Sequence, residues 1–98
     1  MTPDPRRPRR IVAKATGRVQ GVSFRVFCAD EAMRLHVDGY ARNLPDPRAV
    51  EVVAEGTEHA LRMFVERLRE GPRMAVVDDV VYRWEDATGE FAGFEAVI

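Results

Sequence analysis

Apolar and polar residues alternate with a period of two along several stretches of this chain. Between residues 10 and 16, for example, Ile11, Ala13 and Ala15 fall on one side of the pattern and the residues between them on the other. Such alternation, bounded by turn residues, is typical of a β-strand with one buried face. The same reasoning predicts strands over residues 10–16, 39–44, 50–55 and 76–84, and a short fifth strand over 94–98.

Two other stretches carry apolar residues at helical spacing. The first predicted helix runs from Phe24 to about His36, with Ser23 as a candidate N-cap. The second begins after Thr57, a good N-cap residue, and ends at Gly71-Pro72. The apolar stripes of the two helices consist of Phe24, Cys28, Ala32 and Leu35 in the first, and Leu61, Phe64, Val65 and Leu68 in the second.

The predicted elements follow one another in the order β-α-β-β-α-β, with a short strand added at the C-terminal end. The Pro45-Asp46-Pro47-Arg48 segment has turn chemistry, so the second and third strands should form a hairpin. This order predicts an α+β, ferredoxin-like two-layer sandwich, with an antiparallel sheet and both helices on one face. Because many unrelated activities use this architecture, the fold alone does not predict a function.

Composition and charge narrow the class of protein. The chain has 98 residues, enough for one domain, and a formal net charge of −1. Residues 1–10 are rich in Pro and Arg and read as a flexible basic arm, which leaves residues 11–98 as the domain. The domain has more acidic than basic side chains and no aromatic RNA-binding motif, which argues against nucleic acid as a partner, although the arm keeps that alternative open.

The cysteine count and the hydropathy pattern indicate the compartment. Cys28 is the only cysteine, so no internal disulfide is available and no oxidising compartment is implied. No stretch of the sequence has the length and apolar character of a membrane span or a signal peptide. We therefore expect a cytoplasmic protein without a membrane partner.

Residues 17–25 carry the most informative chemistry in the sequence. They read Gly-Arg-Val-Gln-Gly-Val-Ser-Phe-Arg and join a predicted strand to a predicted helix. Backbone N–H groups of a tight glycine-containing loop and of a helix N-terminus can surround an anion. Arg25, in the first helical turn, would add a planar fork of donors for phosphate oxygens. The pattern alone leaves a phosphate site and an ordinary strand–loop–helix turn equally open.

The same nine residues resemble the pattern G-x-V-Q-G-V-x-F-R of the acylphosphatase family, with every specified position present. Residues 39–43, Gly-Tyr-Ala-Arg-Asn, are similar to the family's G-[WY]-V-[RK]-N segment, with Ala41 in place of valine. Gly71-Pro72 and Gly93-Phe94 also fall where members of the family have them. The resemblance extends over residues 12–98.

The resemblance implies a small monomeric hydrolase without metal or cofactor, which converts an acyl phosphate and water into a carboxylate and inorganic phosphate. Arg25 would hold the phosphate, and Asn43 would orient the water that attacks phosphorus in line. The cradle around the phosphate would comprise Arg18, Val19, Gln20, Gly21, Val22, Ser23 and Phe24.

Each of these residues can also be interpreted as having a purely structural role. Without the motif, Asn43 would be an ordinary strand-end residue before a turn, Arg18 a solvated side chain, and Gln20 a support for the turn. Arg42 should point to the face of its strand opposite Asn43. A binding module that keeps the phosphate cradle but does not hydrolyse its ligand is the main competing function.

Two segments depart from the family pattern. The family's leucine-glycine-leucine appears as Leu35-His36-Val37, so the first helix must end without that glycine. The turn at residues 46–51 is one residue longer than the family's Asp-Gly-x-Val-Glu and also lacks glycine. We expect these changes to affect local stability or substrate access, because neither touches Arg25 or Asn43.

Overall fold

The computed structural model describes residues 4–98 and contains every predicted strand and helix, with bounds that differ by a few residues. In chain order the elements are β1 (Arg9–Arg18), α1 (Phe24–Leu35), β2 (Asp38–Asn43), β3 (Ala49–Gly56), α2 (Glu58–Glu70), β4 (Val76–Asp86) and β5 (Phe94–Val97).

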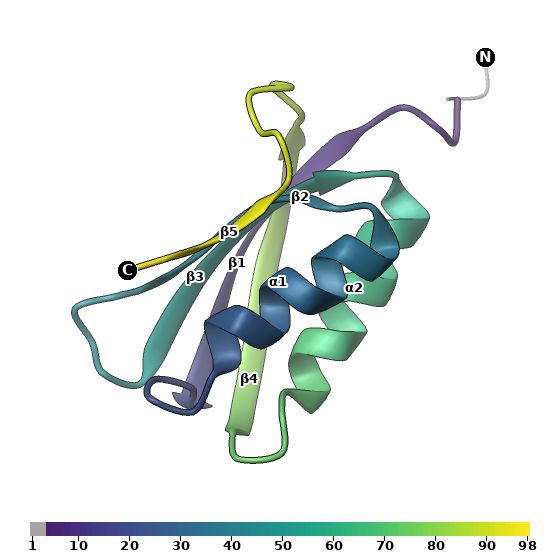
Figure 1. Cartoon of the computed structure of the whole chain (residues 1–98). Helices are drawn as coiled ribbons and strands as arrows, with labels where there is room; N and C mark the ends of the chain where they lie inside the picture. The colour runs from purple at the N-terminus through teal and green to yellow at the C-terminus, as the bar shows by residue number, and fades with distance from the viewer. Residues whose placement is uncertain (1–3) are drawn as a thin grey trace.

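The strands form one sheet in the order β4-β1-β3-β2-β5, and α1 and α2 lie together against one of its faces (Figure 1). This confirms the ferredoxin-like sandwich and the β2–β3 hairpin. The prediction that the whole sheet is antiparallel was wrong, because β5 pairs with β2 in parallel. After β4 the chain reverses direction and crosses to the far edge of the sheet, where β5 lies next to β2. The two strands run in the same direction and therefore pair in parallel.

The hydrophobic core lies between the sheet and the two helices. The predicted stripe of α2 is fully buried, and so are Phe24, Cys28 and Ala32 of α1. Leu35 packs against this core while remaining partly exposed. Of the strands, β1 contributes Ile11, Ala13 and Ala15, the side predicted to face inward. Within residues 4–98, no helix is both long and apolar enough to cross a membrane.

A bulge lies where β1 approaches the predicted phosphate loop. Thr16 pairs with Asp79 and Gly17 with Val77, so Asp78 is the extra residue of β4 at this irregularity. A side chain at Gly17 would place its Cβ 2.2 Å from the Val76 carbonyl oxygen. Only glycine allows this close approach of the two strands.

The N-terminal end of α1 differs from the expectation, whereas the C-terminal end has no glycine, as its sequence requires. Ser23 occupies the N-cap position, but its backbone is left-handed (φ 62°) and its side chain makes no capping hydrogen bond, so the predicted capping role was wrong. At the other end His36 takes the left-handed conformation (φ 57°) that glycine would favour. The N-terminus of α2 is as predicted, because Thr57 Oγ1 accepts a hydrogen bond from the Ala60 N–H at 3.1 Å.

The first strand begins earlier than predicted, and two residues assigned to the arm belong to the sheet. Arg9 pairs with Gly56 and Arg10 with Glu55 in the β1–β3 ladder. The Arg9 side chain also lies 2.6 Å from a Glu58 carboxylate oxygen. Residues 1–3 of the predicted arm lie outside the described residues, and a flexible arm separate from the domain stays a prediction.

Candidate active site

The predicted phosphate loop connects β1 to α1 and is anchored at both ends by buried side chains. Val19 and Phe24 are each 1% exposed and belong to the hydrophobic core. Between them Gly21 (φ 73°) and Ser23 (φ 62°) have left-handed backbones, and Val22 packs partly against the core. Alternation of left-handed and other residues turns successive N–H groups toward one concavity, which is the geometry of an anion-binding nest.

The N–H groups of this loop remain available to a ligand. Within residues 4–98, the backbone N–H groups of residues 21–25 have no backbone acceptor, and the first helical bond into the loop is from the Phe27 N–H to the Ser23 carbonyl, at 3.0 Å. These groups also lie at the positive end of the α1 dipole. The loop is therefore suited to hold an anion by its main chain.

The Gln20 side chain is directed toward the β2–β3 connection and not into that concavity. Its amide nitrogen donates to three backbone carbonyls of the β2–β3 connection, those of Leu44 (3.1 Å), Asp46 (2.9 Å) and Ala49 (2.9 Å). The Gly17 N–H also donates to the Arg48 carbonyl, at 2.9 Å. The phosphate loop and the connection that follows Asn43 are thus held together as one unit.

Arg25 reaches from the first turn of α1 to the edge of the sheet. Its Nη1 donates to the backbone carbonyl of Val97 in β5. Val97 is the register partner of Arg42, the residue before Asn43. The structure therefore brings the Arg25 guanidinium to the same end of the β2–β5 ladder as Asn43, although the two residues are far apart in sequence.

Asn43 is the last residue of β2 and shares the helix-covered face of the sheet with Ala41, which is fully buried. Its Oδ1 atom is buried and has no hydrogen-bond partner in residues 4–98. A buried acceptor without a partner loses the hydrogen bond that water would give it, so it marks a place where a water or a ligand donor fits.

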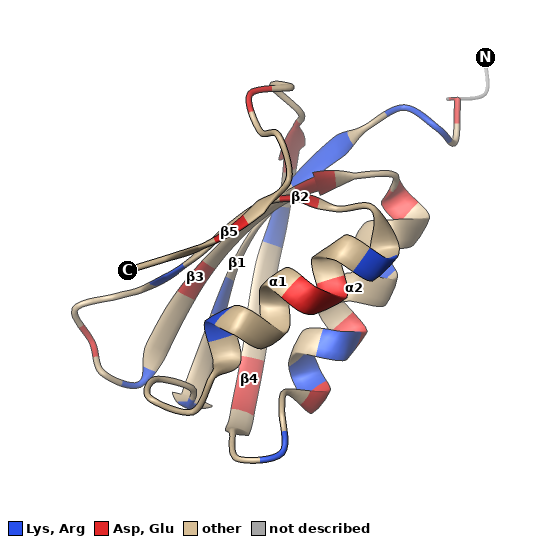
Figure 2. Ribbon diagram, viewed as in Figure 1, with Lys and Arg blue, Asp and Glu red and all other residues tan. Residues whose placement is uncertain are grey.

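Two arginines neighbour these residues in sequence, and the predicted place of Arg18 in the phosphate cradle stays a prediction. Arg42 points to the open face, as alternation predicts, where its guanidinium lies 2.8 Å from the Glu51 carboxylate. Arg18 is exposed at the end of β1, with its backbone paired to Val76. Acidic and basic residues alternate along both helices rather than gathering on one side (Figure 2).

Cys28 and the two histidines lie away from the phosphate loop and Asn43. Cys28 is fully buried in the core, and burial raises the pKa of its thiol. His36 is exposed just after the end of α1, and His59 is exposed near the start of α2.

Sequence reasoning missed the backbone carbonyls that accept hydrogen bonds from the Arg25 and Gln20 side chains. A sequence motif does not single out the carbonyls of Val97 and Leu44, because every residue has a carbonyl. The side-chain contacts of Gln20 favour the interpretation that this residue supports the turn.

The fold and the strand–loop–helix junction define a ferredoxin-like α+β protein, with a loop at one end of its sheet whose main chain is suited to bind an anion. The family model for acylphosphatase matches residues 11–96. An acylphosphatase of Thermus thermophilus is 50% identical over 80 residues, covering 82% of this chain and 90% of the relative.

Solved structures agree with this comparison. The crystal structure of acylphosphatase from Bacillus subtilis superposes with a TM-score of 0.84 and 32% identity, covering 92% of this chain and 98% of that one. An acylphosphatase structure from Coxiella burnetii gives a TM-score of 0.86 at 30% identity, covering 99% and 100%. The chain belongs to the acylphosphatase family, and the prediction of an acylphosphatase-type hydrolase is confirmed.

Proposed function

We propose that this chain hydrolyses the carboxyl–phosphate bond of small acyl phosphates, by attack of a water held at Asn43 on a phosphate held by residues 20–25. The observation that carries this mechanism is the buried Asn43 Oδ1, which has no partner within residues 4–98. The matches to acylphosphatases support the reaction, and this orphaned acceptor supports the role of the residue.

The phosphate group binds in the concavity of the loop. The N–H groups of residues 21–25 donate to its oxygens, and the Arg25 guanidinium neutralises its charge. Within residues 4–98 the Val97 carbonyl occupies one donor of the fork, so the remaining donors of Arg25 can bind the phosphate.

Asn43 positions the nucleophile. Its Oδ1 accepts a hydrogen bond from the water, which leaves an oxygen lone pair directed at phosphorus. An amide cannot act as a strong base, but the reaction does not need one. The leaving group is a carboxylate, and the loose phosphoryl transition state is stabilised by positioning and by the donors around the phosphate.

The P–O bond to the acyl group breaks as the bond from water to phosphorus forms. The products are a carboxylate and inorganic phosphate, and the proton of the attacking water leaves with phosphate or solvent. In this mechanism Arg25 and the main-chain N–H groups supply the charge stabilisation, and no metal or cofactor is assigned a role. We also infer a monomer that acts in the cytoplasm on freely diffusing substrates.

Hydrolysis of benzoyl phosphate by the purified protein in excess chelator tests the proposal. We expect rapid turnover that Arg25→Gln abolishes together with phosphate binding, whereas Arg34→Gln, an exposed arginine in the last turn of the same helix, keeps both. A folded protein that binds inorganic phosphate without turning over benzoyl phosphate would instead be a phosphate-binding module, which is the competing function.

A further inference from the structure

The strand β4 forms one edge of the sheet and leaves its outer side unpaired. The sheet order is β4-β1-β3-β2-β5, so β4 pairs with β1 on one side, and within residues 4–98 no strand lies beyond it. β4 has 11 residues, whereas β5 at the opposite edge has four. A long edge of this kind presents free backbone N–H and C=O groups to a further strand.

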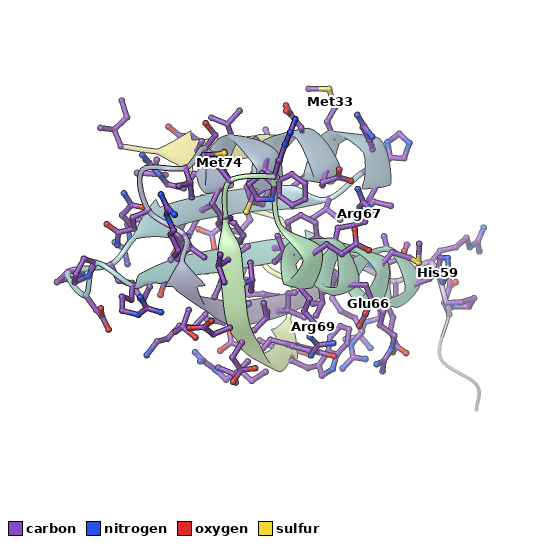
Figure 3. All side chains as sticks on the ribbon, turned by 90° about the horizontal axis from the view of Figure 1, so that it is seen from below. Met33, His59, Glu66, Arg67, Arg69 and Met74 are labelled. Atoms are coloured by element: carbon purple, nitrogen blue, oxygen red, sulfur yellow. The ribbon has the colours of Figure 1, made fainter. Side chains whose placement is uncertain are left out.

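The Val80 carbonyl points to this free edge. Arg69 of α2 lies beside β4 (Figure 3), and its guanidinium donates to the Val80 carbonyl oxygen at 3.5 Å. Backbone groups alternate in direction along a strand. Those of Tyr82 therefore also point outward, whereas those of Val81 point to β1. Residues 80 and 82 are thus the ones that can hydrogen-bond to a strand added at this edge.

The exposed side chains of residues 79–83 consist of an apolar residue between two opposite charges. Val81 is 55% exposed, and Asp79 and Arg83 are exposed on either side of it. These side chains lie on the face of the sheet that the helices leave open, because Val80 is buried in the core. Within residues 4–98 Asp79 has no ion pair, and the 3.1 Å pair of Arg83 with Glu85 is exposed and contributes little.

This segment is complementary to itself. When a second copy of the chain adds its β4 antiparallel, with the two Val81 residues opposite each other, Asp79 of each copy faces Arg83 of the other. The same register places Val80 opposite Tyr82, the two residues whose backbone groups point outward, so it also satisfies the hydrogen-bond pattern. Moving the centre by one residue in either direction puts an acidic or an apolar residue opposite Asp79 instead.

We propose that two copies of this protein associate through β4, which joins their five-stranded sheets into one continuous sheet. Two Asp79–Arg83 ion pairs then flank the contact between the Val81 side chains. The irregularity at Asp78 ends the pairing, so the contact is short. A short contact gives a weak dimer, with a dissociation constant on the order of 0.1 mM.

The proposed dimer leaves the candidate active site of each copy open. Arg25 contacts β5, which lies at the edge of the sheet opposite β4. The monomer inferred above is therefore the catalytic unit and the main species in dilute solution, and the dimer forms as the protein is concentrated.

Sedimentation equilibrium between 10 μM and 1 mM, with charge-reversal variants, tests the association. Asp79→Arg and Arg83→Asp each replace two attractions with two repulsions and should weaken the dimer at least about tenfold. The double variant Asp79→Arg/Arg83→Asp exchanges the charges and should restore the dissociation constant to within about threefold of the parent's. Asp30→Arg, at an exposed position of α1, is the matched control and should leave the dissociation constant unchanged.

Amide hydrogen exchange locates the contact independently of charge. At 1 mM about four fifths of the chains are paired if the dissociation constant is about 0.1 mM, so the Tyr82 N–H should exchange about fivefold more slowly than in dilute solution. Circular dichroism shows that each variant is folded. Hydrolysis of benzoyl phosphate, measured in parallel, reports on the proposed function and should be the same in all variants.

A protein that stays monomeric at 1 mM would overturn the proposal and leave the β4 edge to a strand of another protein. A dimer that both single reversals leave unchanged would also overturn it, because that dimer would use another face. Association with the expected charge dependence, in a protein that does not hydrolyse benzoyl phosphate, would support the dimer and count against the proposed function alone.

Discussion

The side-chain amide of Gln20 donates to the backbone carbonyl of Leu44 across 3.1 Å. Gln20 belongs to the phosphate loop, and Leu44 directly follows Asn43. One side chain thus joins the proposed phosphate-binding segment to the segment that follows Asn43, the proposed water-binding residue. The same nitrogen also reaches the carbonyls of Asp46 and Ala49, so the longer turn at residues 46–51 is fastened to the loop despite its altered sequence.

The isosteric change Gln20→Glu should therefore cost both stability and activity. A carboxylate donates no hydrogen bond and would face three carbonyl oxygens, so we expect a loss of about 2–3 kcal/mol in the free energy of unfolding. We also expect a lower kcat, because Asn43 would no longer be held in place. Denaturant unfolding and steady-state kinetics check this. Unchanged stability would show that the three contacts contribute nothing to the fold.

Asn43→Ala should lower kcat about a hundredfold or more while leaving the dissociation constant of inorganic phosphate nearly unchanged. The stability should not fall, because the substitution removes a buried acceptor that has no partner within residues 4–98. Phosphate titration, kinetics and thermal unfolding of the same preparation separate the three effects. Normal turnover by this variant would disprove the water-orienting role.

His36→Gly should stabilise the protein by about 0.5–1 kcal/mol, because His36 ends α1 in a left-handed conformation that glycine adopts without a Cβ clash. Its side chain is exposed, so little packing is lost. His36→Val should destabilise, since a β-branched residue is poorly accommodated there. Chemical denaturation midpoints compare the three proteins, and a lower midpoint for His36→Gly would contradict this account.

Acid should weaken the protein through Glu55, whose side chain is 7% exposed beside Arg10. Burial acts to raise the pKa of Glu55, but hydrogen bonds from the Thr88 backbone, Arg10 and Gly89 outweigh it and lower that pKa below its usual value. A lowered folded-state pKa contributes stability at neutral pH, and this stability is lost as the pH falls through the folded value.

Glu55→Gln should therefore lower the unfolding free energy at pH 7 by about 2 kcal/mol, since it breaks the Arg10 ion pair and weakens the anchoring of residues 88–89. The difference between variant and parent should shrink between about pH 5 and pH 3, as the parent's carboxylate is protonated. Thermal unfolding over this range measures it. A difference independent of pH would show that the charge of Glu55 does not matter.

The elements of the fold were predictable because their signals are local. The apolar stripe of α2, the Thr57 cap and the strand alternation of β1 each depend on residues a few positions apart. The parallel placement of β5 was not predictable in this way. A strand of four residues has too short a pattern to specify its partner, and the pairing depends on where the connection after β4 crosses the sheet.

The same division applies to the site. The sequence by itself determined the element order, the glycine-containing loop before α1, and Arg25 and Asn43 as the residues to examine, because these depend on residue type and spacing. Tertiary structure alone decided that Arg25 meets the Val97 carbonyl, that Gln20 binds the Leu44 segment, and that Asn43 Oδ1 is buried without a partner within residues 4–98. These contacts involve backbone carbonyls and burial, which side-chain identity does not encode and which arise only when distant segments pack together.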